Sequence, residues 1–313
     1  MPPMPASPIR GILLKIASVC LFVCMQTFIK LAGTEVMPGQ VTFYRSAFAL
    51  VPIIAYLAVR HQLRGAFYTA NPIGHLKRGF LGILAMGLGF YGLLHLPMPD
   101  AIAMGYASPL LAVVFAAVIL KETVRAYRWT AVVVGLVGVL IISWPNLSLF
   151  RTGGFASEQA VGAIAVLLSA ALAALAMIQV RQLVATEKTP TIVLYFSITA
   201  AVLSLVTVPF GWPALPLGVT GLLALAGFSG GVAQILLTES YRHADVSAIA
   251  PFEYTSILLG IGIAYVLFND TPTASMLMGT MIVVGAGIFI IYREHQLGLE
   301  RRAARKANPT HPA

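Results

Sequence analysis

The stretch "DAIAMGYASPLLAVVFAAVIL" (residues 100–120) contains one charged side chain, Asp100 at its start, and is otherwise almost wholly apolar. A helix needs about 20 mostly apolar residues to cross the roughly 30 Å of hydrocarbon in a bilayer. This stretch has that length, and Lys121 and Glu122 end it. It therefore predicts a helix that spans a membrane.

The composition of the whole chain extends this prediction. Of the 313 residues, 58% are hydrophobic and only 10% are charged, whereas a soluble domain carries roughly a quarter charged residues. The expected fold is an all-α membrane protein with ten transmembrane helices and a surface that faces the lipid bilayer. No connection is long enough for a separate soluble domain. The ten apolar runs are 11–32, 41–59, 79–96, 100–120, 129–143, 159–181, 190–209, 218–240, 246–268 and 275–292.

The positions of Lys and Arg predict the orientation of these helices, because positive residues stay on the cytoplasmic side. The net charge of +9 is not clustered with aromatic residues, so it predicts no nucleic-acid partner. The connections opposite to the basic ones contain only Arg151, so both termini are expected in the cytoplasm. The basic residues of the alternate connections are Arg60, Arg64, Lys77, Arg78, Lys121, Arg125, Arg128, Arg181, Lys188 and Arg242.

An internal repeat divides the chain. Shifting the sequence so that Pro38 falls on Pro190 also places Met25 on Met177. Five helices per copy is an odd number, so the second copy is expected to enter the membrane upside down. Inverted repeats of this kind are typical of secondary transporters, whose substrate site lies near the midplane between the halves. The expected units are the five-helix repeats at 1–145 and 159–292, followed by a cytosolic tail at 293–313.

The segments "FYRSAFAL" (43–50) and "DAIAMGYASPLLAVVFAAVILKETVRAYRWTAVVVGLVGVLII" (100–142) resemble the EamA family of the drug/metabolite transporter superfamily. A weaker second copy runs from Asp245 to Ile291, and it has Asp270 where the family usually has Glu. The resemblance implies a ten-helix secondary transporter of the bacterial inner membrane, not an enzyme, that moves a small organic solute by alternating access.

Three shorter segments favour one substrate. "GILLKIASV", "PGQVTFYRS" and "ETVRAYRWTAVVVGLVGV" resemble bacterial riboflavin importers, so riboflavin uptake is the first expectation. Sister groups move other solutes, which leaves an exporter of amino acids, related metabolites or drugs as an alternative. A non-transporting membrane scaffold is an alternative of another class. The oligomeric state stays open, a homodimer included.

No cofactor or metal site is expected. "GLGFYG" (87–92) fits the pattern G-x-G-x-x-G, but it lies inside an apolar run without a preceding strand. The sequence has no phosphate-binding P-loop and no Cys/His spacing for a metal, so ATP-driven pumping is not expected of this chain.

Arg45 is a candidate substrate-binding residue. It lies about 6 Å below the outer edge of its helix, by the rise of 1.5 Å per residue. Its counterpart in the second copy is Ser197, so the scaffold itself does not require a cation at this position. We expect an outer-side anchor or gate, suited to an anionic or carbonyl-bearing solute; snorkelling to the headgroups is the alternative.

Glu253 is the second charged candidate. It is expected about 12 Å inside its helix, where a short carboxylate cannot easily reach water. The functional interpretation is an acceptor for the substrate or a proton-coupling group. A buried hydrogen bond to a neighbouring helix is the alternative.

Several uncharged polar and aromatic residues complete the expected site. Glutamines facing lipid would be costly, so both are expected to point inward, either to bridge helices or to contact substrate. The tyrosines are expected to form a stacking surface for a flat ring, although tyrosines near helix ends are also ordinary interface anchors. These candidates are Gln26, Gln234, Tyr44, Tyr91, Tyr106 and Tyr254.

Overall fold

The computed structural model describes residues 8–119, 121, 124–148, 157–184, 186–243 and 250–307. Within these ranges every regular element is a helix and there is no strand. The α-helices are α1 (Pro8–Leu31), α2 (Pro38–Val59), α3 (Leu63–Ala66), α4 (Pro72–His95), α5 (Met98–Gly105), α6 (Ala107–Ile119), α7 (Ala126–Ser148), α9 (Glu158–Val184), α10 (Thr189–Ser204), α11 (Leu217–His243), α13 (Thr255–Phe268) and α14 (Ala274–Ala307). The 3₁₀ helices are η2 (Leu205–Phe210) and η3 (Ala250–Tyr254).

The expected all-α membrane fold is confirmed. In the described ranges, 9 helices are long and apolar enough to cross a membrane, and a shorter apolar helix covers Phe252–Phe268. The shorter one is the predicted run 246–268, whose first residues, 246–249, lie outside the described part of the chain. The predicted run 129–143 is longer than expected, because α7 continues through Pro145 to Ser148.

Prolines and a polar cap fix where helices begin. Pro38 and Pro72 stand in the first turns of α2 and α4, where the missing N–H is not needed by the helix. The Oδ1 atom of Asn71 accepts a hydrogen bond of 2.9 Å from the backbone N–H of Gly74, which satisfies one free donor of α4.

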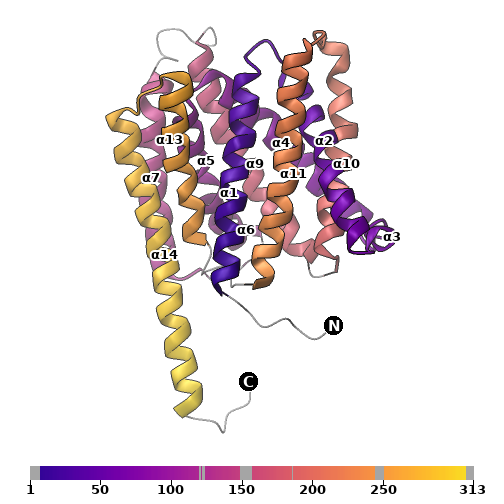
Figure 1. Ribbon diagram of the computed structural model, residues 1–313. Helices are drawn as coiled ribbons and strands as arrows, with labels where there is room; N and C mark the ends of the chain where they lie inside the picture. Colours follow the sequence, from indigo (N-terminus) through magenta and orange to yellow (C-terminus); the bar gives the residue numbers. More distant parts are fainter. Residues whose placement is uncertain are drawn as a thin grey trace.

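The helices pack in pairs that are distant in sequence (Figure 1). α1 lies along α11, α4 along α9, and α7 along α14, while α2 lies beside α10 and α11. The beginning of α1 and the end of α14 lie at the same end of the bundle, and α14 extends beyond the other helices there (Figure 1).

Glycines bring the backbones of neighbouring helices close together. A Cβ atom on Gly231 of α11 would lie 2.7 Å from the carbonyl oxygen of Ala49 on α2. A Cβ atom on Gly279 of α14 would lie 2.5 Å from the carbonyl oxygen of Gly138 on α7. Small residues are typical of such interfaces in membranes, where close packing replaces the hydrophobic effect between helices.

A break at Tyr106 separates α5 from α6. The backbone N–H of Tyr106 bonds to the carbonyl of Ala103 over 3.2 Å, and Pro109 one turn later has no N–H to donate. Non-helical backbone at membrane depth is tolerated where protein or a cavity surrounds it. The second half has a matching irregularity, since η3 precedes α13.

Candidate functional site

A cavity of about 270 Å³ lies between helices of both halves of the chain. Its volume is just below the roughly 300–1,000 Å³ of pockets that hold drug-sized ligands. The walls come from α1, α4, α5, α6 and α9, and most of their side chains are apolar. The wall includes Gln26, Met86, Phe90, Ile102, Ser108 and Ser169.

Gln26 brings an unused hydrogen-bond acceptor to this cavity. Its Oε1 atom is buried and has no partner among the described residues. Ser169, also in the wall, already donates its hydroxyl proton to the carbonyl of Ala85 over 2.6 Å. Because an unpaired buried acceptor is costly, Gln26 is suited to receive a hydrogen bond from a solute.

Arg45 lies directly behind the cavity wall. Its residue is only 7% exposed, and its Nη1 atom contacts the sulfur of Met86 at 3.9 Å. A Cβ atom on Gly230 of α11 would lie 3.4 Å from Nε of Arg45. The side chain therefore points between α4 and α11, so the structure does not show the snorkelling alternative.

Arg78 is a half-buried cation, and its place in the sequence predicts only that it marks the cytoplasmic side. It lies inside the apolar span Pro72–His95, and its Nε and Nη1 atoms are buried without a hydrogen-bond partner. Its guanidinium lies 4.1 Å from the ring centroid of Phe196. Because Arg78 follows Lys77 directly, the sequence suggests two solvent-exposed cations, and nothing in the local sequence indicates that Arg78 points into the bundle and Lys77 does not.

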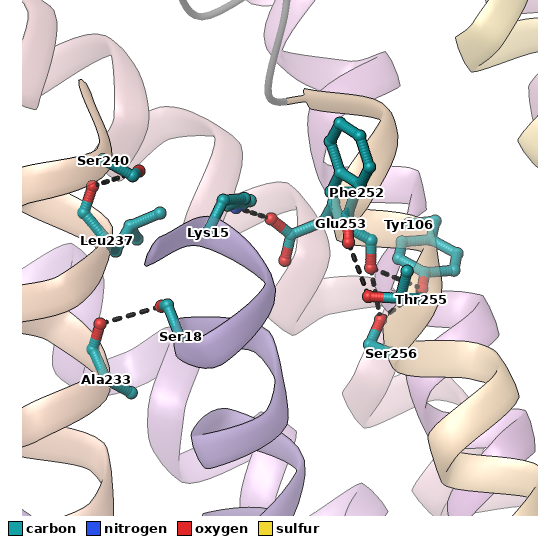
Figure 2. Close-up of polar contacts among 10 residues, drawn as sticks. All are labelled: Lys15, Ser18, Tyr106, Ala233, Leu237, Ser240, Phe252, Glu253, Thr255 and Ser256. Atoms are coloured by element: carbon teal, nitrogen blue, oxygen red, sulfur yellow. Dashed lines mark hydrogen bonds and ion pairs between the residues drawn. The ribbon is translucent and has the colours of Figure 1, made fainter. Parts of the chain in front are cut away.

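Glu253 forms an ion pair with Lys15 of α1 (Figure 2). The side chain of Lys15 is 5% exposed and that of Glu253 is 49% exposed. Glu253 is thus less buried than its expected depth implied, because it precedes α13 in η3. Lys15 was missed, although it is one of two lysines in the apolar run 11–32, the other being Lys30, and a charge inside such a run is the signal that marks it.

Tyr106 and Tyr254 join the two halves without lining the cavity. Their rings meet edge to face with centroids 5.2 Å apart, and the hydroxyl of Tyr106 bonds to that of Ser256 (Figure 2). The hydroxyl of Tyr254 occupies the space that a Cβ atom on Gly287 would need. In this conformation the two rings contact each other edge to face, and the Tyr254 hydroxyl packs against α14 at Gly287.

The other three predicted residues lie away from the cavity. Tyr44 stacks on Phe48 with ring centroids 6.2 Å apart, and Tyr91 stacks on His95 at 4.1 Å. Gln234 borders a separate pocket of about 20 Å³ between α2, α10 and α11, which has room for about one water molecule. Of the predicted residues, the structure brings together Gln26, in the wall, and Arg45, behind it.

A metal centre finds no support in the ranges that the structure describes. No group of three or more His, Cys, Asp or Glu side chains there could hold a metal ion. The cavity offers a solute hydrogen bonding at Gln26, apolar contact with the wall and, from behind the wall, electrostatic attraction of an anionic group by Arg45.

Comparison with known proteins identifies the family of this chain. A model of the EamA-like transporter family matches residues 9–144 and again residues 160–293. A solved crystal structure superposes with a TM-score of 0.65 over 93% of this chain and 99% of the other, at 20% identity. At that identity the superposition shows a shared fold.

Three relatives are transporters. The chain is 29% identical to an S-adenosylmethionine uptake transporter of Rickettsia bellii, over 85% of this chain and 87% of the relative. It is 30% identical to the pseudopaline exporter CntI of Pseudomonas aeruginosa, over 89% and 94%. It is 28% identical to a riboflavin transporter of Vibrio cholerae, over 90% and 93%. With two family matches that together cover most of its length, the chain belongs to the EamA-like transporter family.

Proposed function

We propose that this protein is a secondary transporter that carries a small organic solute through the cavity by alternating access. The proposal rests on one observation: the residues of the cavity wall come from both halves of the chain. Gln26, Met86 and Ile102 belong to the first family match, and Ser169 belongs to the second. A site shared by two halves changes its accessibility when one half moves against the other.

The helix pairing supports two inverted five-helix repeats, at 1–145 and 159–292. α1, the first helix of one copy, packs on α11, the third of the other, and α9 packs on α4 in the reverse sense. The fifth helices, α7 and α14, pack on each other. This exchange of partners is what a two-fold axis between the halves produces, and the odd number of helices per copy favours an axis in the membrane plane.

The same arrangement supports the expected orientation. The beginning of α1 and the end of α14 lie on one side of the bundle (Figure 1). Since the basic connections predict that this side is cytoplasmic, we propose that both termini, with the tail 293–313, face the cytoplasm and that the bundle lies in the inner membrane.

The relatives and the position of Arg45 together suggest a class of substrate. Riboflavin, expected from the sequence and named for the Vibrio cholerae relative, carries no carboxylate or phosphate. The relative of Rickettsia bellii takes up S-adenosylmethionine, an amino-acid derivative with a carboxylate. Because the buried cation Arg45 adjoins the cavity, the geometry favours an amino-acid-type metabolite over riboflavin.

Transport by the purified protein in liposomes tests the proposal. We expect exchange of labelled S-adenosylmethionine or riboflavin above the rate of empty liposomes. Ser169→Phe should abolish it, because the ring fills the cavity. Leu168→Phe is the matched control, since Leu168 is 52% exposed on the outer face of α9. A scaffold protein would exchange neither solute, and equal exchange by both variants would remove the cavity from the pathway.

A further inference from the structure

Two arginines from different helices, Arg45 of α2 and Arg78 of α4, both lie against α4 inside the bundle. Nη1 of Arg45, on α2, lies 3.9 Å from the sulfur of Met86 on α4. A Cβ atom on Gly82 of the same helix would lie 2.2 Å from Nη1 of Arg78. Gly82 and Met86 are one helical turn apart, about 6 Å along the axis. The two guanidinium groups therefore lie against successive turns of α4.

Neither arginine has an acidic partner in the part of the chain that the structure describes. The ion pairs found there join Lys15 to Glu253 and His75 to Glu187. The like charge of Arg45 also acts on Arg78. Burying a charge without a counter-charge is strongly unfavourable, and two neighbouring cations add repulsion to that cost.

The protein itself compensates the charges of Arg45 and Arg78 only weakly. Phe196 faces the guanidinium of Arg78 at 4.1 Å, which gives a cation–π attraction, and the thioether of Met86 is only a weak acceptor for Arg45. Nε of both arginines stays buried and unpaired. An anion placed between the two groups would satisfy these donors and remove the repulsion.

The arginine pair also has access to the cavity. Met86 is at once the contact of Arg45 and part of the cavity wall. Methionine has three rotatable side-chain bonds and adapts its shape readily. A change of its rotamer would open the cavity toward the guanidinium of Arg45 without moving a helix, and the guanidinium of Arg78 lies against the next turn of α4.

We propose that Arg45 and Arg78 together bind the oxyanion group, a carboxylate or a phosphate, of the solute that occupies the cavity. Guanidinium groups match both anions with two parallel N–H···O bonds. The apolar wall then holds the remainder of the solute, and Gln26 accepts one of its hydrogen bonds. This inference rests on the proposed function only in identifying the ligand as the transported solute.

Thermal unfolding of the detergent-purified protein tests the site with acetate and inorganic phosphate as probes. Each replaces chloride stepwise at constant ionic strength. A specific site gives a rise in Tm that follows the logarithm of the anion concentration above the Kd, about 2 °C at ten times the Kd. The anion with the lower Kd identifies the group: acetate indicates a carboxylate and phosphate a phosphate.

Neutral variants assign the response to the two arginines. We expect Arg45→Gln and Arg78→Gln to lose this anion-dependent rise and to melt higher than the wild type in chloride alone, because each removes a cation that has no counter-charge among the described residues. Arg64→Gln, on an exposed position of α3, should behave as the wild type. If a glutamine variant does not fold, Arg45→Lys and Arg78→Lys replace it and should weaken binding at least about fivefold, since an ammonium cannot form the paired bonds.

A wild type whose Tm does not rise more than that of the Arg45 and Arg78 variants with either anion overturns the site. Failure of the proposed function is a different result. In that case the anions still stabilise the protein through both arginines, but liposomes exchange no solute.

Discussion

The ammonium group of Lys15, on α1, forms an ion pair with the carboxylate of Glu253, on η3 (Figure 2). These residues are 238 positions apart and belong to different halves of the chain. Lys15 is buried and Glu253 is half exposed. The pair therefore joins the first helix of one half to the fourth span of the other beside a surface that solvent or headgroups reach.

Replacing Glu253 by Gln should destabilise the protein, because Lys15 then stays buried without a counter-charge. We expect a loss of about 1–3 kcal/mol in the free energy of unfolding, between the values for exposed pairs and for fully buried pairs. Thermal or denaturant unfolding in detergent measures it.

The double variant Lys15→Met/Glu253→Gln is the control for this prediction. Removing both charges leaves no unpaired ion, so the double variant should be more stable than Glu253→Gln alone. Equal stability of the single and double variants would show that Lys15 finds another partner when Glu253 is neutral.

Gly287 of α14 provides the space that the ring of Tyr254 occupies. A Cβ atom there would lie 1.6 Å from the Tyr254 hydroxyl oxygen. Gly287→Ala should displace this ring from its edge-to-face contact with Tyr106, with a loss of about 1–3 kcal/mol, as is usual for overpacking. Unfolding in detergent gives the value.

Gly285 is the matched control, two residues away on the same helix. A Cβ atom at this position meets nothing within 4 Å. Gly285→Ala should leave the stability within about 0.5 kcal/mol of the wild type, as at most unconstrained surface sites. A similar loss in both variants would point to the helix backbone of α14 rather than to Tyr254.

The spans could be predicted because membrane helices are set by local composition. A run of about 20 apolar residues has few alternatives in lipid, so α1, α2 and α11 fall close to their predicted ranges. The end of α7 was wrong because Pro145 and Asn146 resemble loop punctuation. The last turn of a helix tolerates them, since Asn146 bonds to Asp100 of α5 over 3.2 Å.

The site was harder to predict, because it depends on which helices are neighbours. The partner of Lys15 and the surroundings of Arg78 come from helices across the bundle. The local sequence shows that each is a charge in or beside an apolar run, but it does not show what each side chain contacts. Tyr106 and Tyr254 were expected to face a ligand, whereas in this structure the two rings contact each other edge to face. Gln26 and Arg45 were singled out by the cost of polar groups in an apolar helix, which the sequence does reveal, and they lie in and behind the cavity wall.

Glu187 connects two loops at one end of the bundle and should make stability depend on pH. Its Oε1 atom accepts hydrogen bonds from Thr69 Oγ1 at 2.6 Å and from the backbone N–H groups of Ala70 and Asn71 at 2.8 and 3.0 Å. Burial alone would raise the pKa of Glu187, but these bonds and His75 outweigh it and lower the pKa below its ordinary value of 4.5.

A lowered pKa means that the ionised carboxylate stabilises the fold. This contribution is fully present above pH 4.5, the ordinary value, and is lost as the pH falls through the lower pKa of the folded state. Melting curves of the wild type should therefore shift down below this pH more steeply than those of Glu187→Gln. At pH 7 the variant should be less stable by about 1–3 kcal/mol, the range for hydrogen bonds to a charged group. Parallel pH profiles would mean that the carboxylate does not hold these loops.

Gln26 and Gln234 offer a direct comparison of two glutamines with different surroundings. Gln26 lines the cavity and keeps an unpaired buried oxygen, whereas Gln234 borders the small separate pocket. Gln26→Leu should leave the stability nearly unchanged, since no protein partner of that oxygen is lost. It should raise the KM for transport about 2- to 10-fold, the equivalent of one hydrogen bond of about 0.5–1.5 kcal/mol to the solute. Gln234→Leu should leave the KM as it is. If Gln234→Leu raises the KM and Gln26→Leu does not, then the solute passes along α2 and α11, and the cavity between α1, α4 and α9 is not its path.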